Sequence, residues 1–163
     1  YRVLIILQKK HSIPILIKKI IDSSPTGFKW IIRHHPKGKK FRSSDFSKNG
    51  NVLVSNFIDQ MSVSVLSACV HTSLSEGSAM SLELAQLGVE GVLFGDEGYK
   101  NYVDEISAGY LHHVETESEF FNIVANQATR VAQINSGQSH ISGADTKLFD
   151  FVKSIIDLSE RTD

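Results

Sequence analysis

The segment from Ser75 to Gly88 combines residue types that can bind an anion. The small residues Ser75, Gly77 and Ser78 follow a short apolar stretch and directly precede a helical pattern. Free backbone N–H groups and the positive end of the helix dipole meet at such a turn, so it favours a phosphate or a carboxylate. Glu83 lies more than one turn further on and can still face the ligand, where its carboxylate can accept hydrogen bonds from sugar hydroxyls. An ordinary strand–loop–helix connection with Ser78 as the helix cap explains the same residues, and both interpretations stay open.

A second polar group follows the apolar stretch 28–34. Arg33, His35 and Lys37 alternate there, and Pro36 restricts the backbone between them. A guanidinium binds phosphate through two parallel hydrogen bonds, an ammonium binds it as a point charge, and His35 can add one donor. A structural ion pair is the alternative role of Arg33. A phosphate site beside an acceptor for ribose hydroxyls predicts a nucleotide ligand.

Several common catalytic motifs are missing from the sequence. It contains no GxxxxGK[ST], GxGxxG or GxSxG segment, which weakens the hypotheses of an ATPase, a dinucleotide oxidoreductase and a hydrolase. No metal-binding motif is present, and we expect no metal cofactor. Glu76 in the small-residue loop would repel a phosphate unless it points away from it. We expect structural roles for the histidines at positions 34, 71, 112 and 113.

The elements that must position these residues alternate along the chain. We expect strands at 2–8, 28–34, 52–54, 70–74, 91–94 and 110–113. We expect helices at 13–21, 58–68, between Ser78 and Gly88, and at 99–106, 116–134 and 144–159, with residues 37–51 forming a loop. This order predicts a Rossmann-like, doubly wound α/β domain with a largely parallel six-stranded sheet. Ligands of such sheets bind at the carboxyl ends of the strands, where both polar groups fall.

Smaller features refine this expectation. Ser12 can cap the helix 13–21, and Thr116 with Glu119 forms a capping box for the helix that follows them. Met80, Leu84 and Leu87 share one stripe of the helix that Gly88 should end. We assign 1–134 to the ligand-binding domain and 135–163 to a loop and a terminal helix that packs on the same domain.

Composition narrows the class of protein. Of 163 residues, 41% are hydrophobic and 21% are charged, as in water-soluble globular domains, and no apolar run reaches the roughly 20 residues needed to span a bilayer. Cys69 is the single cysteine, so no internal disulfide can form, and a reducing, cytoplasmic setting fits. The chain opens inside a strand at Tyr1, from which we expect a fragment of a longer protein.

The charge is divided unevenly along the chain. Residues 1–50 contain twelve Lys and Arg against two Asp and Glu, whereas residues 51–163 contain five against sixteen. Such a division suggests a face that binds an anion, with a solvated basic loop as the alternative. Because aromatic residues are not interleaved with the basic ones and the whole chain carries a net charge of −1, we expect no nucleic-acid partner.

Two segments resemble those of bacterial two-domain glycosyltransferases of the GT-B fold that build capsule and surface polysaccharides. The segment Arg33-His34-His35-Pro36-Lys37 resembles their R-x-H-P motif, and 77–88 is similar to their S-S-x-x-x-E-A-x-x-x-G helix start. In the second segment Ser78, Glu83 and Gly88 match, Leu84 replaces the usual small residue, and one serine of the pair is absent. The run 93–109 also matches the family's pattern, so the resemblance covers roughly residues 1–134.

The resemblance implies a donor-binding half of a GT-B enzyme. Arg33 and His35 would stabilise the leaving phosphate, the Gly77–Ser78 turn would donate N–H groups to it, and a nucleotide-sugar, with a pyrimidine favoured, would be the donor substrate. The acceptor domain would precede this chain, which would bind the donor without being active alone. We expect a cytoplasmic protein; attachment to the inner membrane through the parent protein stays open.

Two other hypotheses remain compatible with the sequence. Half of a UDP-sugar 2-epimerase-like enzyme would share the fold and a similar serine/glutamate helix. A non-catalytic α/β ligand-binding module is the alternative outside the enzymes. A flavodoxin-like receiver is disfavoured, because Gln8-Lys9-Lys10 stands where such a domain needs an acidic cluster.

Overall fold

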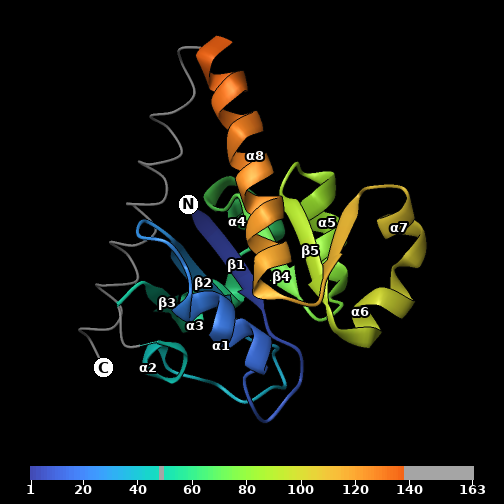
Figure 1. The fold of residues 1–163 in the computed structure, drawn as a ribbon. Helices are drawn as coiled ribbons and strands as arrows, with labels where there is room; N and C mark the ends of the chain where they lie inside the picture. Colours follow the sequence, from blue (N-terminus) through green and yellow to red (C-terminus); the bar gives the residue numbers. More distant parts are fainter. Residues whose placement is uncertain (48–49, 138–163) are drawn as a thin grey trace.

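The computed structural model describes residues 1–47 and 50–137, with side chains described up to residue 127. Its centre is one six-stranded sheet in which every pair of neighbouring strands is parallel (Figure 1). The strands are β1 (Arg2–Ile6), β2 (Lys29–Arg33), β3 (Val52–Val54), β4 (Thr72–Ser75), β5 (Glu90–Phe94) and β6 (Leu111–Val114). The order β3-β2-β1-β4-β5-β6 confirms the predicted Rossmann-like α/β fold.

The strand order reverses between β1 and β4. From β1 the chain proceeds outward through β2 to β3, then crosses back to β4 on the other side of β1 and proceeds through β5 to β6. The loops that follow β1 and β4 therefore lead away from each other, which leaves a crevice at the carboxyl ends of these two strands. Both predicted polar groups follow strands next to this point, β2 and β4.

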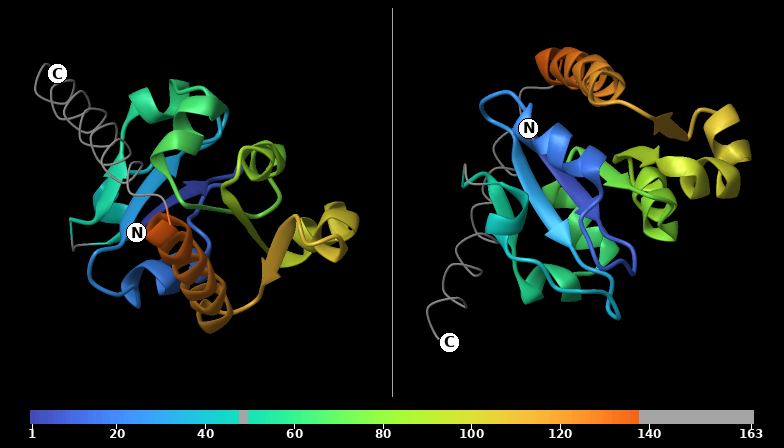
Figure 2. Two further views of the ribbon diagram at one scale, coloured as in Figure 1. Left: turned by 90° about the horizontal axis from the view of Figure 1, so that it is seen from above. Right: turned by 60° about the horizontal axis from the view of Figure 1, so that its bottom comes forward.

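Helices cover both faces of the sheet (Figure 2). The helices are α1 (Ile15–Asp22), α2 (Ser43–Phe46), α3 (Asn56–Gln60), α4 (Val63–Cys69), α5 (Ala79–Gln86), α6 (Gly95–Asn101), α7 (Val103–Ser107) and α8 (Glu117–Gly137). Helices α1 and α8 lie on one face, α3, α4 and α5 on the other, and α6 and α7 flank the edge formed by β5 and β6.

Alternation along the buried strands produces two separate cores. In β1, Val3 and Ile5 point to the face with α1 and α8, where they pack with Trp30 and Phe120. Leu4 and Ile6 point to the other face and belong to the cluster that contains the buried hydrophobic residues of α3, α4 and α5. A strand buried on both faces explains the continuous apolar run in the sequence.

Several predicted boundaries were wrong, each for a local reason. Ser12 does not cap α1, which begins at Ile15 after Pro14, whose side chain makes no cap hydrogen bond. The helix expected at 58–68 is two helices: Met61 is extended, with φ −62° and ψ 141°, and the Ser62 hydroxyl accepts the Val65 N–H to start α4. A one-turn helix, α2, interrupts the loop expected at 37–51.

The segment after β5 also differs from the prediction. A helix was expected at 99–106, but α6 begins at Gly95 and α7 follows after a break at Tyr102, which has φ −131°. On α5 the expected apolar stripe is shorter than predicted, since Leu84 is fully buried whereas Leu87 at the end of the helix is 52% exposed.

The predicted end of α5 and the predicted capped start of α8 are confirmed. Gly88 has φ +86°, and its N–H donates to Ala85 O, which ends α5. At the start of α8 the Glu119 carboxylate accepts the Thr116 N–H at 3.3 Å, and the Glu119 N–H donates to the Thr116 hydroxyl at 3.3 Å. Cys69 is buried at the end of α4, as expected of a small core residue.

Within residues 1–47 and 50–137, no helix combines the length and the apolar character required to cross a membrane. Residues 135–137, which were expected to form a loop, belong to α8. The rest of that loop and the helix expected at 144–159 lie outside the described residues.

Candidate functional site

An open pocket of about 260 Å³ lies at the point where the strand order reverses. Its walls come from the ends of β1 and β2, the loop after β2, and the start of α5. Four predicted site residues line it together, namely Arg33, His35, Ser78 and Glu83. Lys37, Ser75 and Gly77 do not line this pocket, although each adjoins a segment that does.

Arg33 ends β2 and directs its guanidinium across the sheet edge toward α3. Its Nη1 donates to Met61 O at 2.6 Å, which uses one of five N–H donors. Partial burial lowers the pKa of Arg33, and the carboxylates of Asp59 and Glu83 oppose that shift. Arginine stays protonated at neutral pH even so. Arg33 is therefore a positioned cation with donors left for a ligand.

His35 is held by a tight turn that starts with its own carbonyl. Gly38 N–H donates to His35 O at 2.9 Å, and Lys37 N–H donates to His35 Nδ1 at 3.1 Å. Because Nδ1 accepts, the neutral ring carries its proton on Nε2, which can donate to a ligand. The side chain of Lys37 is exposed on the outside of the same turn.

The loop after β4 has an internal hydrogen-bond system centred on Ser75. This side chain is completely buried, and its Oγ accepts the N–H groups of Gly77 at 3.3 Å and Ser78 at 3.1 Å. The two backbone donors predicted to bind phosphate thus already have a partner in this structure. The Ser75 hydroxyl also forms a hydrogen bond with the Ser81 hydroxyl at 2.8 Å. Ser75 therefore holds the backbone of the loop in place.

Ser78 is the N-cap of α5. Its hydroxyl accepts the Met80 N–H at 3.3 Å, and the helix it starts carries Glu83 on its exposed side. The capping role left open by the sequence is therefore present, and Ser78 also lines the pocket. Phosphate binding by Gly77 and Ser78 stays a prediction.

Gly77 fixes how the loop packs. It has φ +114°, and a Cβ on it would stand 3.2 Å from the Cα of Gly98 in α6. Only glycine combines this conformation with so close a backbone approach. The loop after β4 and the helix after β5 are thereby held together beside the pocket.

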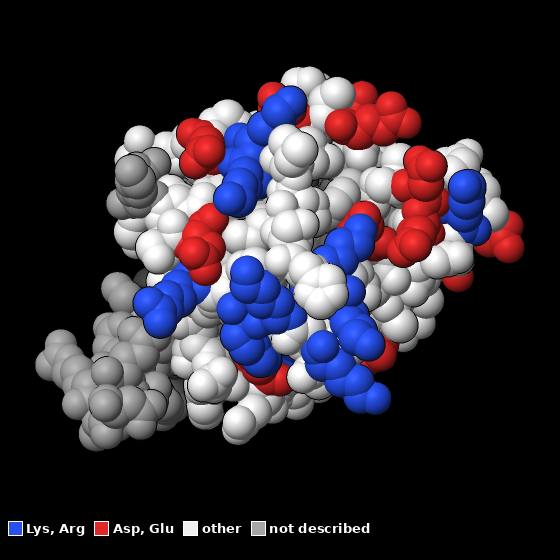
Figure 3. All heavy atoms as spheres, turned by 90° about the horizontal axis from the view of Figure 1, so that it is seen from below, with Lys and Arg blue, Asp and Glu red and all other residues white. Residues whose placement is uncertain are grey.

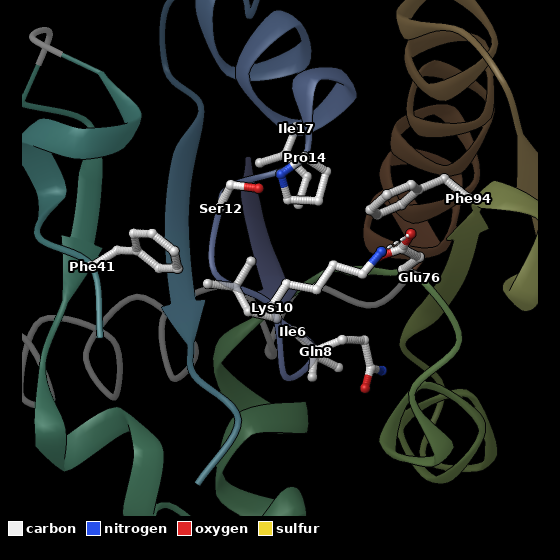
Figure 4. A pocket seen from close by; sticks show the side chains of 10 residues that line it. Ile6, Gln8, Lys10, Ser12, Pro14, Ile17, Phe41, Glu76 and Phe94 are labelled. Atoms are coloured by element: carbon white, nitrogen blue, oxygen red, sulfur yellow. Dashed lines mark hydrogen bonds and ion pairs between the residues drawn. The ribbon is translucent and has the colours of Figure 1, made fainter. Parts of the chain in front are cut away.

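Glu76 does not point toward the pocket that Arg33 lines. Its carboxylate pairs with the ammonium of Lys10, which reaches across the crevice from the loop after β1 (Figure 4). The pair borders a cavity of about 10 Å³ between Pro14 and Phe94, enough for about one water. The α1 side of the crevice is thus filled, whereas the α5 side is open. The repulsion of phosphate that Glu76 threatened is reduced by its pairing with Lys10.

A group that sequence analysis did not find adjoins the pocket. His34 N–H donates to Asp59 Oδ1 at 2.6 Å, while Asp59 Oδ2 lies 3.2 Å from His34 Nδ1 and 2.6 Å from Lys40 Nζ. His34 Nε2 accepts the Phe41 N–H at 3.0 Å, so Nδ1 carries the ring proton and donates to Asp59. Burial would raise the pKa of Asp59, but these hydrogen bonds from His34 and Lys40 hold that pKa below its usual value.

The face that contains the pocket is basic. Figure 3 looks onto the carboxyl ends of the strands, where Lys and Arg side chains gather near the centre. The exposed basic residues of the loops after β1 and β2 are Lys9, Lys10, Lys37, Lys39, Lys40 and Arg42. These two neighbouring loops therefore bring part of the basic excess of residues 1–50 to the ligand end of the sheet.

Comparisons with known proteins add no further constraint. Scans of protein-family models, curated proteins and solved structures returned no match to this chain. Among the described residues, no three His, Cys, Asp or Glu side chains are grouped so that they could hold a metal ion. The chemistry of the pocket is therefore argued from its own residues: a guanidinium, an imidazole donor, a hydroxyl and a carboxylate.

Proposed function

We propose that this chain is the donor-binding half of a glycosyltransferase, which holds a nucleotide-sugar for transfer to a surface polysaccharide or another glycan. The observation that carries the proposal is the convergence of Arg33, His35, Ser78 and Glu83 on one pocket at the strand-order reversal. These residues come from two segments more than 40 positions apart, and they are the ones that the GT-B resemblance assigns to the donor.

The roles follow from the chemistry of each group. Arg33 and the Nε2–H of His35 supply donors for the phosphate, and they would stabilise the negative charge that develops on the leaving nucleotide. Glu83, on the opposite wall, supplies acceptors for the ribose hydroxyls. The N–H groups of Gly77 and Ser78 join them if the ligand competes with Ser75 Oγ. The base is most simply a pyrimidine, as the resemblance implies.

The acceptor domain and the catalytic base would belong to a preceding domain of the parent protein. The isolated chain would then bind the donor without transferring the sugar. The parent would work in the cytoplasm, alone or attached to the inner membrane.

A thermal-shift panel with CMP, CDP, UMP, UDP, GDP and ADP tests the proposal. A nucleotide at about 100 times its dissociation constant adds about 2.7 kcal/mol to the free energy of unfolding, which raises Tm by several degrees. We expect a pyrimidine nucleotide to give this shift, and the Arg33→Ala and Glu83→Ala variants to lose it. The matched controls Lys18→Ala and Glu115→Ala replace exposed charges outside the pocket and should keep it. Absence of a shift both here and in the two-domain parent would refute the donor role.

A further inference from the structure

A second and larger hollow lies beside the proposed donor pocket. It measures about 630 Å³ and is bounded by residues 40–44 on one side and by the start of α3 on the other. His34 lines both spaces, so a ligand in one would lie next to a ligand in the other. The volume is within the range of about 300–1,000 Å³ that small-molecule sites occupy.

The charge of this hollow is positive. Of the residues that the structure describes, no Asp or Glu lines it, whereas Lys40 and Arg42 do. Lys40 is neutralised by Asp59 behind it, at 2.6 Å. Arg42 is exposed, and its guanidinium makes no ion pair with the described residues. The Asp45 carboxylate, which is outside the lining, accepts the backbone N–H of Arg42 at 2.7 Å. Within the part of the chain that the structure describes, the guanidinium is therefore the unpaired cation at the opening. A guanidinium pairs best with a planar carboxylate or a phosphate.

The remaining lining suits a ring with hydroxyl groups. Phe57 on α3 is a 38% exposed aromatic ring, which offers an apolar surface to one face of a sugar. The Ser55 Oγ accepts the Phe57 N–H at 3.2 Å, which leaves its own O–H free to donate. The amides of Asn56 and Gln60 add donors and acceptors beside it. The aromatic ring suits the apolar face of a sugar, the polar side chains suit its hydroxyl groups, and the cation suits a carboxylate on it.

We propose that this hollow binds a carboxylate-bearing sugar unit, with Arg42 pairing the carboxylate and Phe57 packing against the ring. Its role as an additional contact for the acceptor, whose main site would lie in the preceding domain, rests on the proposed donor function, because that function places the nucleotide-sugar in the adjoining pocket. Binding of the acidic sugar in the hollow does not depend on that function. The growing chain would then carry uronate or sialate units.

NMR titration of ¹⁵N-labelled protein tests the inference. The probes are a hyaluronan tetrasaccharide and a disialic acid, with the chitin tetrasaccharide as the neutral match of the first. We expect at least one of the acidic probes to shift the amide resonances of residues 40–44 and 55–57. The neutral probe should bind at least about tenfold more weakly. Arg42→Ala should weaken acidic binding about tenfold, and Phe57→Ala should weaken it through a different contact. Lys19→Ala, an exposed change on α1, should leave it unchanged.

Other results overturn either the inference or the donor role. Equal binding of the neutral tetrasaccharide removes the role of the carboxylate, and failure of both acidic probes removes the site. Loss of nucleotide binding in Arg42→Ala without any acidic-sugar binding assigns the hollow to the nucleotide. Acidic-sugar binding without nucleotide binding would instead refute the donor role and leave the sugar site intact, so the two proposals fail separately.

Discussion

At the scale of single residues, Asp59 connects the second strand to the site. Its side chain is only 11% exposed, and its two oxygens accept from the backbone and ring of His34 and from Lys40. The residue that follows His34 is His35, which lines the donor pocket. The carboxylate thus fixes the direction in which the chain leaves β2 toward the predicted phosphate ligand.

Replacing Asp59 by Asn should destabilise the protein at neutral pH. The amide oxygen of Asn can still accept the His34 N–H, but its NH₂ group would face the Nδ1–H of His34 and the ammonium of Lys40, both of which are donors. We expect a loss of about 1–3 kcal/mol in the free energy of unfolding, measured by urea denaturation at pH 7. Asp22→Asn, at the exposed end of α1, should change it by no more than about 0.5 kcal/mol.

The cost of Asp59→Asn should depend on pH. The pKa of Asp59 is lower in the folded protein than in the unfolded chain, so its ionised form contributes stability above about pH 4. That contribution is lost as the pH falls through the folded-state pKa. The difference between wild type and variant should therefore shrink below pH 4, and a difference that stays constant down to pH 2.5, on the order of one unit below the usual Asp pKa, would contradict the assignment.

The sequence could not have indicated this group. His34 and Asp59 are 25 positions apart; His34 stands at the variable position of the R-x-H-P segment, and Asp59 lies in no motif. Arg33, His35 and Ser78 could be predicted because each lies at or just after a recognisable strand end, and parallel strands bring those ends together. Glu83 could be predicted from its place on the helix that follows the second of these strand ends. The hydrogen bonds from Gly77 and Ser78 to Ser75 could not be predicted from the sequence. The same loop sequence is compatible with a serine that binds an external anion and with one that binds the backbone of its own loop.

At the scale of elements, the loop between β4 and α5 depends on one close backbone contact. Gly77→Ala would combine a left-handed φ of +114° with a Cβ 3.2 Å from Gly98 Cα, which is backbone and cannot rotate away. We expect a loss of more than about 2 kcal/mol in the free energy of unfolding. Displacement of the loop should also weaken nucleotide binding, measured on the same protein by thermal shift.

The Gly27→Ala variant separates the effect of backbone strain from the effect of the close contact made by Gly77. Gly27 has φ +95°, but a Cβ on it would meet nothing within 4 Å. This variant should lose about 1 kcal/mol from backbone strain alone and keep its nucleotide binding. Equal losses in the two variants would show that the packing of Gly77 on α6 contributes nothing.

The helices and strands were predicted correctly where an apolar pattern extends over many residues. The prediction failed where one or two residues interrupt a helix. The buried strand β1 and the capped helix α8 follow directly from an apolar run and from the Thr116–Glu119 pair. The division of 56–69 into α3 and α4 rests on Met61, which is buried in the core while its carbonyl accepts from Arg33. That tertiary contact overrides an apolar pattern that would continue the helix.

At the scale of the whole molecule, exposed basic residues from the loops after β1 and β2 lie on the face that holds both proposed sites (Figure 3). Lys9 follows Gln8 and Lys37 follows Pro36, and both Gln8 and Pro36 line the donor pocket. Exposed cations around an opening raise the local concentration of an anionic ligand, an effect that salt screens. Raising the ionic strength from about 0.01 M to about 0.15 M shortens the Debye length from about 30 Å to about 8 Å.

The affinity for the pyrimidine nucleotide should therefore fall with salt, by about threefold or more over this range. Isothermal titration calorimetry on the double variant Lys9→Gln/Lys37→Gln should show weaker binding at low salt and a smaller salt dependence. Lys18→Gln/Lys19→Gln on α1 changes the net charge by the same amount outside the pocket lining, and it should behave like the wild type. If both double variants lost affinity equally, net charge alone would control binding. The placement of the basic residues at the carboxyl ends of the strands would then have no part in attracting the ligand.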